Sequence, residues 1–227
     1  MGPNVAAILL MAGIGSRLGS PLPKQFHLLG SKKIYLHTLE KFLESGLFQQ
    51  IILVCHPDWI DEVKTEIPSH VLVISGGPNR QSSSLLGLQA CNLKTQVVMI
   101  HDAVRPFVSQ EILERNISAV QRHLAVDTCI PSADTVVHSE EGQWITSIPK
   151  RKFYLRGQTP QTFDYQLICE AHRKTQLTES TDDCSLVLEL GHPVAIEAGE
   201  ENNIKITTEL DVEMAEWILS QKTVSAS

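Results

Sequence analysis

The sequence has no excess of positive charge and no long apolar segment. Its 19 Lys and Arg residues are outnumbered by 26 Asp and Glu residues, which gives a net charge of −7 at pH 7. Nucleic acids require a basic surface, so this composition argues against a nucleic-acid partner, and a basic cluster is expected to be a local anion site. The longest apolar run, residues 5–12, is too short to cross a bilayer.

Disulfide, metal and targeting signals are also missing. The 5 cysteines are widely spaced and form no C-x-x-C pair, so we expect reduced thiols and no zinc site. The first residues lack the charged start and cleavage region of a signal peptide, and Ala6 stands where a myristoylation motif requires Ser or Thr. We expect a protein of the bacterial cytoplasm that does not bind membranes.

The chain contains no internal repeat or long linker, and a single domain over residues 1–227 is the simplest organisation. Short, continuous apolar runs predict strands at residues 5–11, 51–55, 71–74, 97–100, 128–130 and 194–196. Helical patterns lie between them, at about residues 33–44, 59–66, 81–90, 110–123 and 210–219. This alternation predicts an α/β fold with a mostly parallel sheet flanked by helices.

Residues 134–156 interrupt the alternation. Residues 135–137 and 144–146 flank the polar turn Glu140-Glu141-Gly142, which predicts a protruding β-hairpin arm. Such an arm either packs on a second subunit or is an ordinary surface hairpin, and the sequence leaves both open.

A glycine-rich turn follows the first predicted strand. Gly13, Gly15 and Gly19 match neither the G-x-G-x-x-G fingerprint nor a P-loop. Backbone N–H groups of such a turn can approach phosphate oxygens at the carboxyl end of a strand. Because Arg17 and Lys24 lie on or just after the turn, a triphosphate suits it better than a dinucleotide. The alternative is a tight turn with two solvated cations.

A second glycine pair follows the third predicted strand. Gly76 and Gly77 precede Arg80 and the serines 82–84, and these residues could bind a base, a ribose or a phosphate at the start of a helix. An ordinary turn with serine caps explains the same pattern.

The segment from His101 to Pro106 follows the fourth predicted strand. It places Asp102 where a carboxylate can bind Mg²⁺ or a sugar hydroxyl, and Arg105 where it can pair an anion. An Asp–Arg salt bridge is the alternative. We expect His101 to be a packed side chain, since no G-x-S-x-G elbow accompanies it. Arg151 and Lys205, each taken alone, are typical of solvated surface residues.

Taken together, these segments resemble the small cytidylyltransferase family typified by 2-C-methyl-D-erythritol 4-phosphate cytidylyltransferase. The matching stretches occur in the family's order between residues 9 and 208, and they are LLMAGIGSRLGSPLPKQF, GGPNRQSSSLLGL, HDAVRPF, ADTVV, RGQTPQTF and NNIKITT. The resemblance implies a Rossmann-like nucleotidyltransferase fold, a homodimer clasped by the hairpin arm, and Mg²⁺ as cofactor. It also implies the reaction of CTP with a polyol phosphate to give a CDP-polyol and pyrophosphate.

The resemblance also assigns residues. The positions that match the family's triphosphate-binding loop are Ala12, Gly13, Arg17 and Lys24. Gly77 and Ser83 match positions that hold the cytosine and ribose. The stretch that meets Mg²⁺, nucleotide and acceptor is matched by Asp102, Ala103 and Arg105. Positions that contact the acceptor phosphate, partly from the partner subunit, are matched by Thr135, Arg151 and Thr159, and Lys205 matches the second catalytic lysine.

The chain departs from the family pattern in several places. Met11 replaces a usual small residue in the loop, and Asn202 stands where the family often has Asp. Val137 and His138 follow Asp-Thr where the erythritol enzymes often carry a lysine. These departures put in doubt the backbone contacts at Met11 and a carboxylate role at position 202.

The implied chemistry agrees with these residues. A phosphate acceptor is already an anion near neutral pH, since its second pKa is about 6, and no general base is needed. The difficulty is the approach of two anions, which Mg²⁺ and cations must offset. The expected catalytic residues are Arg17, Lys24 and Lys205. Arg17 would hold the triphosphate, Lys24 and Lys205 would stabilise the transition state, and Asp102 would help to place Mg²⁺.

The acceptor is the open point. PLPKQF, IPKRKFYLRGQTPQTF and AVDT resemble a sister branch that uses D-ribitol 5-phosphate, whereas TDDCSLVLELGHPV resembles the erythritol branch. The erythritol enzyme, which serves non-mevalonate isoprenoid precursor biosynthesis, is the commoner one and is our first hypothesis; ribitol 5-phosphate is the alternative. A sugar-phosphate nucleotidyltransferase that uses UTP or GTP, and a non-catalytic nucleotide-sensing module, are the competing functions.

Overall fold

The computed structural model describes residues 2–13 and 22–225. The strands are β1 (Val5–Met11), β2 (Leu28–Leu29), β3 (Lys32–Lys33), β4 (Gln50–Cys55), β5 (Leu72–Ser75), β6 (Val97–Asp102), β7 (Ala125–Pro131), β8 (Leu155–Asp164) and β9 (Ala195–Ala198). The α-helices are α1 (Ile34–Ser45), α2 (Ile60–Glu66), α3 (Arg80–Gln89), α4 (Gln110–His123), α5 (Tyr165–Lys174), α6 (Cys184–Glu189) and α7 (Glu209–Ser225). Short 3₁₀ turns are η2 (Lys24–Phe26), η3 (Pro57–Trp59) and η4 (Arg151–Phe153).

The main sheet has the strand order β5-β4-β1-β6-β8-β7-β9. Its strands pair in parallel except that β8 runs antiparallel to both β6 and β7. This confirms the prediction of an α/β fold with a mostly parallel sheet. Because β1, β4 and β6 are parallel, their carboxyl ends meet at one edge of the sheet, and the antiparallel β8 begins beside that edge.

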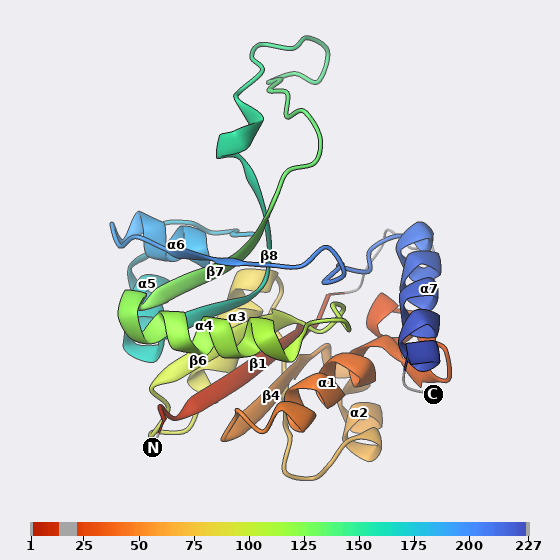
Figure 1. Cartoon of the computed structure of the whole chain (residues 1–227). Coiled ribbons are helices and arrows are strands. Elements are labelled where there is room, and N and C mark those ends of the chain that lie inside the picture. Colours follow the sequence, from red (N-terminus) through yellow and green to blue (C-terminus); the bar gives the residue numbers. More distant parts are fainter. Residues whose placement is uncertain (1, 14–21, 226–227) are drawn as a thin grey trace.

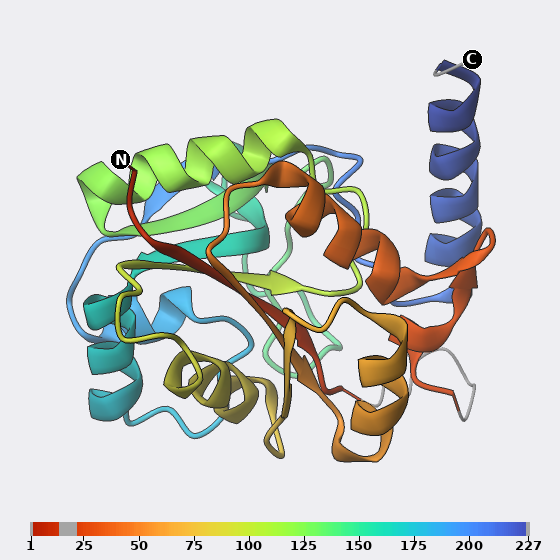
Figure 2. The ribbon, with the colours of Figure 1, turned by 90° about the horizontal axis from the view of Figure 1, so that it is seen from below.

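Helices cover both faces of the sheet. Side chains of β1 alternate between two cores: Leu9 packs with residues of α1 and α4, and Ile8 packs with residues of α3 and α5. Figure 2 shows α1 and α4 on one side of the sheet, and α3 and α5 on the other. All of β1 is buried, as expected of a central parallel strand, and each fully buried Leu or Ile contributes about 1.5–3 kcal/mol to folding.

Helix α7 packs beside the sheet rather than on it. Ala215 and Ile218 join a core with Leu29, Ile34 and Val104, and Figure 1 shows α7 standing next to α1. Among the helices of residues 2–13 and 22–225, none combines the length and the apolar character of a membrane span.

Most predicted elements are confirmed. α4 has the predicted bounds, and its predicted N-cap Ser109 accepts a hydrogen bond from the N–H of Ile112 at 3.2 Å. Strand β8 and helices α5 and α6 were not predicted. β8 contains Gly157 and Pro160 within a polar sequence, which hides its strand character.

The arm protrudes from the body between β7 and β8, over residues 132–154 (Figure 1). The prediction of two hairpin strands in it is wrong: residues 135–137 and 144–146 form no strand, and one isolated bridge, His138 to Ser147, links its two halves. Its apolar side chains are exposed, Trp144 by 75% and Phe153 by 71%. An isolated hairpin without a core to pack on gains too little to form a regular ladder.

Candidate active site

A cavity of about 320 Å³ opens at the carboxyl ends of β1 and β6 and the start of α3, and we name it the α3 cavity. It brings together residues that are distant in sequence and that were predicted to form a site. These are Ala12, Gly13, Lys24, Gly77, Ser83, Asp102 and Lys205. Arg17, predicted for the same site, lies outside the described residues.

The backbone of the α3 cavity is fixed by local hydrogen bonds. The N–H of Gly77 donates to Ser83 Oγ at 3.1 Å, and Ser83 Oγ donates to the carbonyl of Asn79 at 2.8 Å. A Cβ on Gly77 would lie 2.4 Å from Ser82 Oγ, so this close turn requires glycine. On the opposite wall, Gln25 Nε2 donates to the carbonyls of Met11 and Gly13 at 2.7 and 3.0 Å, which anchors the start of the glycine-rich turn.

A second cavity of about 210 Å³ adjoins the first, and we name it the β8 cavity. Its lining is polar: Arg105, Asp127, Gln158, Thr159, Gln161 and Asp182 contribute to it. Arg80, Asp102 and Lys205 line both cavities. These three charged side chains therefore form the boundary between the two spaces.

Asp102 is the electrostatic centre of that boundary. Its Oδ2 lies 2.8 Å from Lys205 Nζ and 3.5 Å from Arg105 Nε. Burial alone would raise the pKa of the Asp102 carboxyl, but the charges of Lys205, Arg80 and Arg105 outweigh it and hold the pKa well below its usual value. Asp102 is therefore an anion at neutral pH, and its pair with Arg105 is the Asp–Arg salt bridge that was the alternative interpretation of this segment.

His101 is fully buried beneath this boundary. Its Nε2 lies 3.2 Å from the carbonyl oxygen of Arg105, and its Nδ1 lies 3.1 Å from Thr159 Oγ1. A carbonyl can only accept, so we assign the ring proton to Nε2, and Thr159 donates to Nδ1. Thr159 Oγ1 in turn accepts from the N–H of Asp102 at 3.1 Å. His101 is thus the packed side chain that was expected, and it orients two residues of the β8 cavity.

The far wall of the β8 cavity carries two carboxylates, Asp127 and Asp182. Asp127 Oδ1 accepts from Gln161 Nε2 at 3.1 Å. Burial and the nearby charge of Asp182 raise the pKa of Asp127. The register of β7 against β8 shifts between Asp127 and Cys129, and such irregularities re-aim side chains next to functional sites.

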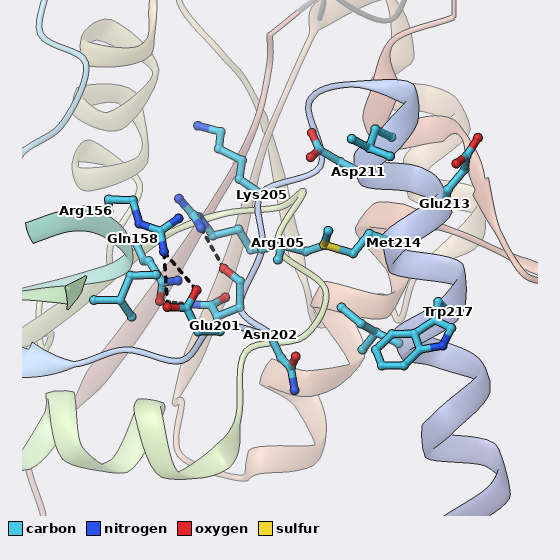
Figure 3. A pocket seen from close by; sticks show the side chains of 16 residues that line it. Arg105, Arg156, Gln158, Glu201, Asn202, Lys205, Asp211, Glu213, Met214 and Trp217 are labelled. Carbon is cyan, nitrogen blue, oxygen red and sulfur yellow. Dashed lines mark hydrogen bonds and ion pairs between the residues drawn. The ribbon is translucent and has the colours of Figure 1, made fainter. Parts of the chain in front are cut away.

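An open groove of about 880 Å³, the α7 groove, lies between the start of β8 and α7. Figure 3 shows Met214 and Trp217 projecting from α7 on one side and the Arg156–Glu201 ion pair on the other. Arg105 and Lys205 also line this groove, so it is continuous with the charged boundary.

The remaining predicted residues lie elsewhere. Ala103 is buried, and its carbonyl accepts from Thr38 Oγ1 at 2.8 Å rather than facing a cavity. Thr135 and Arg151 are exposed on the arm, where Arg151 Nη1 donates to the carbonyl of Ala133 at 2.7 Å. Within one chain the structure does not bring Thr135 or Arg151 to either cavity.

Sequence reasoning missed several lining residues. Arg80 was noted as a possible contact to a base, a ribose or a phosphate but was not counted among the site residues, although it lines both cavities. Asp127 and Gln161 were not singled out; the available signal was a charged residue inside an otherwise apolar strand, and a polar residue directly after Pro160.

Two adjoining cavities that share a charged boundary lie at the carboxyl edge of the sheet, where open α/β folds bind their ligands. The fold and the site therefore define an α/β protein whose cationic side chains suit phosphate groups. Comparison with known proteins gives the particular family. A family model described as 2-C-methyl-D-erythritol 4-phosphate cytidylyltransferase matches residues 5–221, and the chain belongs to this family.

Individual relatives agree with that assignment. A ribitol-5-phosphate cytidylyltransferase of Lactiplantibacillus plantarum is 35% identical over 236 residues, covering 96% of this chain and 100% of the relative. The solved 4-diphosphocytidyl-2C-methyl-D-erythritol synthase of Anaerococcus prevotii has a TM-score of 0.84 and 30% identity, covering 96% of this chain and 97% of that one. The 2-C-methyl-D-erythritol 4-phosphate cytidylyltransferase of Thermus thermophilus has a TM-score of 0.75 and 31% identity, with 96% and 98% covered. The protein is a CTP-dependent cytidylyltransferase.

Proposed function

We propose that the protein transfers the cytidylyl group of CTP to 2-C-methyl-D-erythritol 4-phosphate, with CTP in the α3 cavity and the acceptor in the β8 cavity. The observation that carries this proposal is the boundary between the cavities, where Lys205 Nζ lies 2.8 Å from Asp102 Oδ2. The names of the family model and of the two solved structures support the acceptor.

The reaction is an in-line displacement at the α-phosphorus of CTP. An oxygen of the acceptor phosphate forms the new bond to phosphorus, and the bond to the oxygen that bridges the α- and β-phosphates breaks. Pyrophosphate leaves with that electron pair. Both partners are anions, so the protein's contribution is positioning and positive charge rather than proton transfer.

The lysines of the α3 cavity supply the charge. Lys24 and Lys205 line it from different parts of the chain, and we assign them to the oxygens of the reacting and leaving phosphates. Arg105, which lines the β8 cavity, suits the acceptor phosphate because a guanidinium can bind two phosphate oxygens at once. Thr159 donates its hydroxyl proton to His101 and accepts from the N–H of Asp102, so its remaining lone pair is a candidate acceptor for a hydroxyl of the polyol.

Asp102 fits a role in holding Mg²⁺. The described residues contain no group of three or more His, Cys, Asp or Glu side chains that could cage a metal. Mg²⁺ needs no such cage, since it typically binds one or two carboxylates together with substrate phosphates and water. The ionised Asp102 carboxylate, which lines the α3 cavity, meets that requirement. When bound, the ion would neutralise charge on the triphosphate.

We further propose a homodimer joined through the arm. Its support is the exposed apolar surface of the arm, which includes Trp144, Ile148 and Phe153; such a patch marks an interaction surface. In that dimer, Thr135 and Arg151 would reach the acceptor bound to the partner subunit. Sedimentation velocity tests this: Trp144→Ser with Phe153→Ser should shift a dimer to monomer, and a monomeric wild-type protein contradicts the proposal.

A cytoplasmic location agrees with the cysteines, none of which forms a disulfide.

D-Ribitol 5-phosphate is the second candidate acceptor, and two observations favour it. The curated relative from L. plantarum carries that activity in its name. In addition, Asp127 and Asp182 give the β8 cavity carboxylates that can accept hydrogen bonds from the hydroxyls of a polyol, and ribitol offers more hydroxyls than methylerythritol.

The test is pyrophosphate release from CTP with each acceptor in turn. Lys24→Ala and Lys205→Ala should each lower kcat by about 10²–10³ while raising KM less, because their charge acts mainly on the transition state. Lys94→Ala, at an exposed position, is the matched control and should retain wild-type turnover.

The outcomes separate the candidates. Higher kcat/KM with one polyol phosphate identifies the acceptor. Tight CTP binding without release of pyrophosphate from CTP in the presence of either acceptor would support a nucleotide-sensing module instead. Wild-type turnover by Lys205→Ala or Lys24→Ala would withdraw the catalytic role of that lysine.

A further inference from the structure

Arg80 occupies a distinctive place in the site. It is the first residue of α3 and lines both the α3 cavity and the β8 cavity. Its charge is also one of those that stabilise the ionised form of Asp102. An arginine side chain has many rotamers, so a guanidinium at this boundary needs a partner that fixes its direction.

That partner is Asp183, which precedes α6 and is fully buried. Its Oδ2 accepts from Arg80 Nη1 at 2.7 Å. Its Oδ1 accepts from Ser84 Oγ at 2.7 Å and lies 2.9 Å from His172 Nε2. The N–H of Asp183 donates to Gln161 Oε1 at 3.0 Å, which ties the same residue to β8.

The partners of Asp183 come from separate elements. Ser84 lies one turn after Arg80 in α3, His172 is on α5, and Gln161 is on β8. Burial alone would raise the pKa of Asp183, but Arg80, His172 and Ser84 outweigh it and keep the pKa low. A carboxylate held so firmly presents its second oxygen to Arg80 in one direction.

Stability alone does not explain this buried ion pair. Buried ion pairs often contribute little to stability compared with apolar residues of similar size. A fixed guanidinium at a reaction centre is different, because charge that is already oriented needs no rearrangement during the reaction. The guanidinium has five N–H donors, so the contact with Asp183 leaves others for phosphate oxygens.

We propose that Asp183 is a positioning residue that holds Arg80 at the boundary between the two cavities, where the guanidinium contacts the phosphates of the bound substrates. This inference rests on the proposed function, because it requires two phosphate groups to meet at that boundary. Ser84 and His172 support the carboxylate of Asp183 and have no contact of their own with substrate.

The test is a double-mutant cycle in kcat/KM for the acceptor, at saturating CTP. Arg80→Met, which removes the charge at similar length, should lower kcat/KM by about 10²–10³. Asp183→Asn, which turns an N–H toward Arg80, should lower it by about 10–100-fold through misplacement. The variant carrying both changes should be no slower than Arg80→Met alone, because Asp183 acts through Arg80. Asp164→Asn, at the N-cap of α5, is the matched control and should be near wild type.

A purely structural role for Asp183 predicts something else. In that case Asp183→Asn would lower the urea midpoint. It would also lower kcat/KM by the same factor whether Arg or Met stands at position 80. Multiplicative losses in the cycle therefore overturn the inference. If Asp183→Asn does not fold, Ser84→Ala, which removes one of the bonds to Asp183, replaces it in the cycle with the same expected pattern. Absence of turnover by the wild-type protein with either polyol phosphate would overturn the proposed function itself, and this inference with it.

Discussion

The burial of His101 makes the stability of the protein depend on pH in a defined window. Burial lowers the pKa of His101 to about 4 from an ordinary value of 6.5. The ring packs 5.1 Å from that of Phe42, and both of its nitrogens are already in hydrogen bonds. Between pH 6.5 and 4 the unfolded chain binds a proton at His101 that the folded protein excludes. Acid therefore favours the unfolded state in this window, and stability falls as the pH falls.

The size of the effect follows from those two pKa values. Proton linkage with values of 6.5 and about 4 gives a loss of about 2 kcal/mol in the free energy of unfolding between pH 7 and pH 5. Asp102 and Asp183 contribute little in this range, because their pKa values are lowered in the folded state and the ordinary pKa of an unfolded Asp, about 3.9, also lies below pH 5.

Urea unfolding at pH 7, 6 and 5 measures the loss. The comparison protein is His101→Gln, whose side-chain amide can donate to the Arg105 carbonyl and accept from Thr159 without titrating. The wild type should lose about 2 kcal/mol more than His101→Gln over this range. His70→Gln, at an exposed site, is the control and should follow the wild type. Parallel curves for wild type and His101→Gln would refute the reasoning.

Two further predictions concern the walls of the site. A Cβ on Gly76 would lie 2.3 Å from Ala12 Cβ and 3.0 Å from Ser83 Oγ, so Gly76→Ala should raise KM for CTP by about 10–100-fold. The control is Gly2→Ala, which lies in open space and should leave KM unchanged. An unchanged KM for Gly76→Ala contradicts this account of the α3 cavity. Ser109 caps α4 and donates to Glu200 Oε1 at 2.6 Å. Ser109→Ala should therefore lower the free energy of unfolding, measured in urea, by about 1 kcal/mol and leave kcat unchanged. A loss below a few tenths of a kcal/mol would show that water replaces the cap.

The sequence predicts best where one physical cause acts alone. Apolar runs such as residues 5–11 predict β1 because a central parallel strand is covered on both faces. The N-cap serine and helical spacing predict the bounds of α4 for a similar reason. In both cases the local pattern is strong, and no distant contact is needed to read it.

Prediction fails where a distant partner decides the structure. The segment Leu155–Asp164 becomes a strand because β6 and β7 pair with it on both sides, and its polar side chains serve the β8 cavity. Residues 135–137 and 144–146 look like strands, yet within one chain they lack a surface to pack on. For the site, motif residues such as Lys24 and Lys205 were found, but the orientation of Arg80 depends on Asp183, which lies 103 residues away.

The direction of β8 is what joins the two cavities. Parallel strands deliver their carboxyl ends to the edge where Asp102 ends β6. A parallel strand in place of β8 would put its early residues at the opposite edge. Because β8 is antiparallel, Gln161 pairs with Ile100 and the preceding residues extend past the end of β6. Thr159 thereby reaches the N–H of Asp102. The one reversed strand thus brings a polar wall against the nucleotide side of the sheet, which a fully parallel sheet could not do with the same residues.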